Sequence, residues 1–191
     1  GYGGLGYMTT SLERGCDCLG EIRYLDETLA HSSGEPYTIN QAICIHEEDN
    51  AVLWKHVDNN GRAEVRRMRR LVISAHATVA NYEYLIYWRL YTDGNIECEI
   101  RATGIMVTTP LSPGQATPAT GTLVDHRTYA PFHHHFLVAR LDLDVDGPAN
   151  SVLEVDSFAP EISPENPYGL ALQTRSTVIA SEAESGRDFD F

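Results

Sequence analysis

Basic residues are scarce in this chain of 191 residues. Fourteen Lys and Arg stand against 27 Asp and Glu, so the formal net charge at pH 7 is -13. Non-specific nucleic-acid binding depends on Lys and Arg displacing the counterions of phosphates, so the charge balance argues against a nucleic-acid partner. The one basic run, at residues 66 to 70, leads into an apolar pattern, and we interpret it as a solvated face or an interface patch.

Long apolar runs and paired cysteines are missing as well. No apolar run approaches the roughly 20 residues that a spanning helix needs, so no membrane span is expected. The four cysteines are too few for a disulfide scaffold and form no Cys-x-x-Cys pair. A single residue separates Cys16 from Cys18, which is poor spacing for a zinc finger.

A sustained helical period of apolar residues is absent, whereas strand and turn patterns recur. Asn59-Asn60-Gly61 and Asp93-Gly94 are strong hairpin turn sequences, and they flank a long apolar run from Leu71 to Tyr91. Beyond the second turn, residues 96 to 101 alternate apolar and charged side chains, which is typical of a strand with one wet face.

The second half of the chain carries weaker patterns. Four prolines between residues 108 and 131 predict a long loop, a strand is expected from Phe136 to Val145, and residues 156 to 168 are expected to be irregular. The pattern as a whole predicts an all-β fold, part of a large antiparallel β-sandwich, with residues 1 to 191 in one domain.

Two histidines have the spacing of metal ligands. On a strand, residues two apart project from the same face, so His133 and His135 would lie side by side while His134 points away. Two imidazoles so placed suit half of a Cu(II) or Zn(II) site, with a third ligand from elsewhere. The alternative is that both are surface or core histidines bonded to the backbone.

A series of short blocks gives these histidines a context, beginning with Leu-Gly-Tyr-Met and Cys-Asp-Cys-Leu-Gly and including Asn-Tyr-Glu-Tyr and His-His-His-Phe. In chain order the blocks occupy residues 5–8, 16–20, 45–49, 55–56, 81–84, 102–105, 133–136, 139–142, 146–147, 164–169 and 185–187. Together they resemble the copper-containing amine oxidases over essentially the whole chain, at the front half of the large catalytic β-sandwich domain.

The resemblance implies a chemistry for four residues. Tyr82 would be the precursor of the quinone cofactor topaquinone, Asn81 would help to orient its ring, and His133 and His135 would be two of three copper ligands. The implied reaction is oxidation of a primary amine by O2 to an aldehyde, ammonia and hydrogen peroxide. The implied protein is a homodimer, in peroxisomes or outside cells.

Two further sites follow from the resemblance. Cys18 and Cys44 align with a disulfide of the family, although two buried thiols are the plain alternative. Asp142 and the Leu143 carbonyl are candidates for a peripheral calcium-type site. The acidic run that begins at Asp142 is not an EF-hand, because its twelfth position is Leu153 instead of glutamate.

The chain also departs from the family pattern. The catalytic aspartate would lie about two residues before Gly1 and the third copper histidine beyond Phe191, so we expect a fragment truncated at both ends. Tyr2 stands in place of an expected Glu, His134 in place of Gln, and Ala80 is a small-residue variant. A β-sandwich relative that has lost activity and acts as a binding module, and an unrelated His-x-His metal-binding sandwich, stay open as alternatives.

Overall fold

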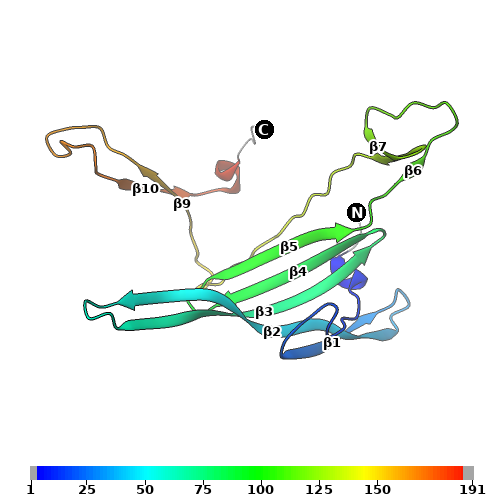
Figure 1. Cartoon of the computed structure of the whole chain (residues 1–191), viewed down its shortest axis with the longest axis horizontal. Helices are drawn as coiled ribbons and strands as arrows, with labels where there is room; N and C mark the ends of the chain where they lie inside the picture. Colours follow the sequence, from blue (N-terminus) through cyan, green and yellow to red (C-terminus); the bar gives the residue numbers. More distant parts are fainter. Residues whose placement is uncertain (1–3, 187–191) are drawn as a thin grey trace. The chain divides into compact units, whose positions relative to one another are not determined.

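The computed structural model describes residues 4–186, and these are mostly antiparallel strands (Figure 1). The chain divides into two units, Gly1–His133 and His134–Phe191. The all-β antiparallel class expected from the sequence is confirmed. Tyr2, which departs from the family pattern, and Arg187, which belongs to the last of the sequence blocks given above, lie outside the described residues. No helix within residues 4–186 has the length and apolar character to cross a membrane.

The first unit contains a five-stranded sheet in which strand order equals chain order. Its strands are β1 (Ile22–Ala30), β2 (Pro36–Val57), β3 (Ala63–Val79), β4 (Tyr82–Tyr91) and β5 (Ile96–Gly104). All four neighbouring pairs are antiparallel. Beyond the part of β2 that pairs with β1, its distal half pairs with β3, and the two form a two-stranded arm.

The turns of this sheet show which local signals decided the chain path. The loops at 58–62 and 92–95 confirm the two hairpins expected from their Asn, Asp and Gly residues. A two-residue turn at Ala80 and Asn81 divides the apolar run from Leu71 to Tyr91 between β3 and β4. Apolar residues continue on both sides of that turn, so their pattern did not reveal it.

The two faces of the sheet differ in polarity. Residues directly opposite one another in an antiparallel pair share a face. The face that carries Tyr82 continues with Tyr84, Ile86 and Trp88, opposite the mostly apolar residues of β3 from Ile73 to Val79. The other face carries Arg89 and a row of charged partners. We call these the Tyr82 face and the Arg89 face.

The N-terminal segment covers part of the Arg89 face. It contains η1 (Leu5–Met8) and joins the sheet beside β3, where the Thr10 amide donates to the His76 carbonyl at 2.9 Å. A small core cluster forms there from Leu12, Cys18 and Cys44, with Ile22 and Tyr24 packed against it.

The rest of the chain forms shorter elements. The loop expected at 108 to 131 contains a three-stranded sheet of β6 (Thr109–Pro110), β8 (Thr128–Pro131) and β7 (Gly121–Asp125). The second unit has one hairpin, β9 (Val152–Phe158) with β10 (Gln173–Ile179), followed by η2 (Glu182–Ser185). The irregular stretch expected at 156 to 168 overlaps the end of β9.

The strand expected from Phe136 to Val145 is wrong. The stretch from 132 to 151 has no regular secondary structure, so His133 and His135 do not lie on a strand. A strand requires a neighbour whose N–H and C=O groups pair with its own. No strand of the described chain pairs with these residues, and an alternating pattern alone does not supply one.

Candidate functional site

The turn at Ala80 and Asn81 positions Tyr82. Val79 and Tyr82 face each other as the last pair of the β3–β4 ladder, so the loop between them has only two residues. Ala80 has a φ of 54°, a left-handed conformation that an alanine adopts at a cost. Beside the turn, the Thr78 hydroxyl donates to the Glu83 carboxylate at 2.9 Å and links the two strands. Tyr82 therefore begins β4 in a fixed register.

The phenol of Tyr82 meets an imidazole 51 residues later in the chain. Its Oη lies 2.5 Å from Nε2 of His133, and the two ring centroids are 5.4 Å apart. The residue proposed as the cofactor precursor and one of the two proposed copper ligands therefore lie in direct contact.

A second hydrogen bond sets the tautomer of the His133 ring. Nδ1 lies 3.2 Å from the Pro131 carbonyl, at the end of β8. A carbonyl oxygen only accepts, so Nδ1 carries the proton and donates it. In the neutral ring Nε2 is then the lone-pair nitrogen, which accepts from the Tyr82 hydroxyl. Metal-binding histidines are held in the same way, by a carbonyl on one nitrogen.

His135 and Asn81 are the other two members of the predicted site. His135 lies in the second unit, exposed and without regular secondary structure. Asn81 is exposed, and its carbonyl accepts a hydrogen bond from the Ile105 amide at 2.7 Å. No group of three His, Cys, Asp or Glu side chains able to hold a metal ion occurs in the described part of the chain.

The two cysteines of the predicted disulfide lie in one buried cluster. Cys18 and Cys44 are 5% and 0% exposed, and both thiols are free. Burial, together with a hydrogen bond to Cys18, raises the pKa of the Cys44 thiol to about 12. The His46 Nδ1 atom lies 3.5 Å from the Cys44 sulfur. The pairing stays a prediction that this proximity supports.

The predicted peripheral cation site lies in an exposed loop. Asp142 is exposed, and the Leu143 carbonyl accepts a hydrogen bond from the Asn150 side-chain amide at 2.9 Å. The same amide donates to the Gly147 carbonyl at 2.7 Å. Asn150 thus links the two ends of the loop from 143 to 150. Its amide already donates to the Leu143 carbonyl, the oxygen that a cation would use.

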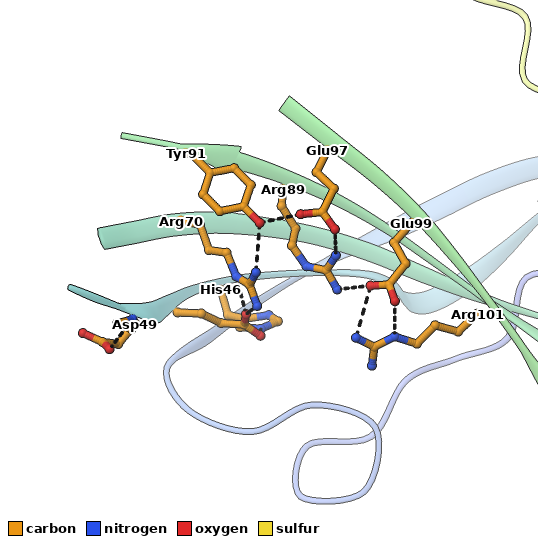
Figure 2. Close-up of polar contacts among 10 residues, drawn as sticks. His46, Asp49, Arg70, Arg89, Tyr91, Glu97, Glu99 and Arg101 are labelled. Carbon is orange, nitrogen blue, oxygen red and sulfur yellow. Dashed lines mark hydrogen bonds and ion pairs between the residues drawn. The ribbon is translucent and has the colours of Figure 1, made fainter. Parts of the chain in front are cut away.

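A network of charged side chains crosses the Arg89 face, and sequence reasoning missed it (Figure 2). Arg89 is 4% exposed, donates to Glu97 at 2.8 Å and also donates to Glu99. Its Nε is buried and has no hydrogen-bond partner among residues 4–186. The network consists of His46, Glu48, Arg70, Tyr91, Glu97, Arg89, Glu99 and Arg101. The wet face expected for β5 therefore carries Glu97 and Glu99, the carboxylate partners of the buried Arg89.

The basic run at 66 to 70 is neutralised by its neighbours. Arg67 forms a two-pronged contact with Asp49 across the β2–β3 arm. Arg69 contacts Glu47 at 2.6 Å. Arg66 and Arg70 are paired with Glu64 and Glu48. These pairings leave little free positive charge for a phosphate backbone.

Comparison with known proteins gives a consistent match. The family model "Copper amine oxidase, enzyme domain" matches residues 1–191. The chain is 47% identical to a primary amine oxidase of Arthrobacter sp. (strain P1), over 96% of this chain and 28% of the relative. It is 45% identical to histamine oxidase of Arthrobacter globiformis, over 97% of this chain and 27% of that protein.

Plant and yeast proteins are similar too. The chain is 45% identical to a peroxisomal copper-containing diamine oxidase of Nicotiana tabacum, over 100% of this chain and 25% of the relative. Its structure resembles a copper-containing benzylamine oxidase from Hansenula polymorpha with a TM-score of 0.81 and 38% identity, over 92% of this chain and 28% of that one. The chain thus spans about a quarter of the length of the relatives it matches.

Proposed function

This chain belongs to the copper amine oxidase family, and on that premise we propose that the protein it comes from oxidises primary amines with copper and a topaquinone derived from Tyr82. The reaction consumes amine, O2 and water and releases aldehyde, ammonia and hydrogen peroxide. The observation that carries the proposal is the 2.5 Å contact between the Tyr82 phenol and Nε2 of His133.

The residues present fit a copper ion. His133 offers a lone-pair nitrogen beside the phenol, because its other nitrogen donates to the Pro131 carbonyl. Imidazole nitrogens are suitable ligands for Cu(II). His133 and His135 would hold the ion, with a further ligand from elsewhere in the protein. When bound, copper and the quinone supply the redox chemistry and the electrophilic carbonyl that ordinary side chains lack.

The chain's own contribution is to present the phenol. Converting it to topaquinone adds two oxygen atoms and removes two hydrogens, which balances with two O2 consumed and one H2O2 released. The register of β3 and β4 fixes where Tyr82 leaves the sheet, and its hydroxyl donates to His133. Asn81, directly before Tyr82, is proposed to orient the ring.

Further features of the family are proposed for this protein on the same premise. They are a single catalytic β-sandwich domain that includes this chain, a homodimer, a Cys18–Cys44 disulfide, a peripheral cation at Asp142 and Leu143, and a peroxisomal or extracellular location. Peroxisomal relatives support the location, and the shared buried cluster of the two cysteines supports the disulfide.

Phenylhydrazine titration of the copper-loaded, full-length protein tests the proposal, because phenylhydrazine reacts with a quinone carbonyl. We expect an adduct and amine-dependent H2O2 release in the wild type, and neither in Tyr82→Phe. Tyr87→Phe is the matched control, since Tyr87 lies on the same strand but on the Arg89 face. A wild type without an adduct, or one that retains zinc in place of copper, would contradict the proposal.

A further inference from the structure

The end of β5 approaches the turn before Tyr82 more closely than a side chain allows. Gly104 is the cross-strand partner of Tyr82. A Cβ atom at position 104 would lie 2.5 Å from the Asn81 carbonyl oxygen, 2.8 Å from the Tyr82 Cα and 2.9 Å from the Glu83 nitrogen. Ordinary contacts of this kind begin at about 3.4 Å. The Gly104 φ of 115° also lies in the left-handed region that favours glycine.

A hydrogen bond also holds the backbone of the turn before Tyr82. The amide of Ile105 donates to the Asn81 carbonyl at 2.7 Å. Gly104 and Ile105 therefore hold the backbone at Asn81 and Tyr82 from the β5 side, and we call them the Gly104–Ile105 clamp. The β3 side holds it through the Val79–Tyr82 pair.

The other end of the same hairpin provides a contrast. Gly94, in the turn between β4 and β5, has a φ of 90°, and no atom of the described residues lies within 4 Å of a Cβ placed there. Glycine is thus favoured at position 94 by the backbone conformation alone. At position 104 it is favoured both by the conformation and by the close approach of the Asn81–Glu83 backbone. The two glycines separate backbone strain from displacement of the Tyr82 backbone.

Displacement matters because the partner of Tyr82 is anchored separately. His133 is held by the Pro131 carbonyl at the end of β8, which belongs to another sheet. A shift of the β3–β4 turn would therefore change the position of the phenol relative to this imidazole. The contact between Tyr82 Oη and His133 Nε2 is 2.5 Å long, and a shift of about 1 Å would take it beyond the range of a hydrogen bond.

We propose that the Gly104–Ile105 clamp is a positioning device for Tyr82, and that it sets how readily the phenol is converted to the quinone. The clamp acts through the backbone at Asn81 and Tyr82. This inference rests on the proposed function, because it concerns the formation of the same cofactor.

The test compares Gly104→Ala with Gly94→Ala in the full-length protein. Each metal-free variant is loaded with copper, exposed to O2, and followed by quinone absorbance and by phenylhydrazine adduct per bound copper. We expect quinone formation at least about tenfold slower in Gly104→Ala, since a misplacement of about 1 Å can cost a reacting group ~100-fold. Gly94→Ala should stay within about twofold of the wild type. A merely structural role would reduce the yield of folded protein but not the quinone per bound copper.

The possible outcomes distinguish failure of the clamp proposal from failure of the proposed function. A wild type that forms no quinone refutes the proposed function. A wild type that forms quinone while Gly104→Ala matches Gly94→Ala refutes the clamp alone. If Gly104→Ala does not fold, Ile105→Pro, which removes the amide donor and leaves Gly104 in place, decides the question. Quinone formation in Ile105→Pro at the wild-type rate would then overturn the proposal.

Discussion

Replacing Arg89 with methionine should loosen the β4–β5 hairpin and leave the exposed ion pairs of the arm unaffected. Arg89 is 4% exposed and donates to both Glu97 and Glu99, whose side chains are 46% and 33% exposed. The substitution keeps most of the buried aliphatic volume and removes the charge. Both carboxylates can recover some water, so their loss of a partner is less costly than it would be in a dry core.

The expected cost is about 2 kcal/mol. Two charge-assisted hydrogen bonds to partly exposed carboxylates contribute about 1.5 kcal/mol each, and removing the unpartnered Nε recovers about 1 kcal/mol. Since 1.4 kcal/mol is a factor of ten, the amides of β4 and β5 should exchange with solvent roughly 30-fold faster.

Hydrogen exchange of the full-length protein measures this directly. Arg66→Met is the matched control, because the Arg66 side chain is 65% exposed and its partner Glu64 lies on its own strand. Exposed pairs of that kind contribute about 0–1 kcal/mol. Equal exchange in the two variants would refute the view that the network on the Arg89 face stabilises the hairpin.

Three other predictions concern separate regions. Arg67 lowers the pKa of Asp49 from 3.8 to about 2, so the stability that Asp49 contributes is present above pH 4 and lost as the pH falls through 2. In Asp49→Asn the free energy of unfolding should therefore change less with pH in that window, and an unchanged pH profile would contradict this. The buried Asn166 amide donates to the Pro160 and Glu161 carbonyls and accepts from the Ala171 amide. Asn166→Ala should therefore lower the free energy needed to open the loop at 160–171 by about 2 kcal/mol. Limited proteolysis in this loop should be at least about tenfold faster, whereas cleavage elsewhere should not change. Ala80→Gly relieves a positive φ and should stabilise the β3–β4 hairpin by about 0.5–1 kcal/mol, seen as slower amide exchange; faster exchange would count against the strain.

Local chemistry was enough to predict part of the fold. Asn59-Asn60-Gly61 and Asp93-Gly94 predicted their hairpins because Asn, Asp and Gly favour turn conformations in the absence of tertiary contacts. The turn at Ala80 has no such residue at its left-handed position, and the surrounding sheet imposes the conformation. The expected strand at 136 to 145 failed for a related reason, because no described strand pairs with it.

The site was predicted from resemblance more than from residue patterns. Nothing in the local sequence joins Tyr82 to His133, which is 51 residues away. Family motifs supplied that pairing, and the structure brings the two rings together. The network around Arg89 was missed because it depends on the register of β3, β4 and β5, which alternation along one strand does not define.

Chain order and strand order coincide in the five-stranded sheet, and this bears on when the parts of the molecule assemble. Each hairpin joins segments that are adjacent in sequence, so it can close as soon as both have been synthesised. The meeting of Tyr82 with His133 must wait for a later stretch of chain that includes β8. The five-stranded sheet can therefore form before the phenol and the imidazole meet, so the contact on which the proposed function rests requires the later part of the chain as well.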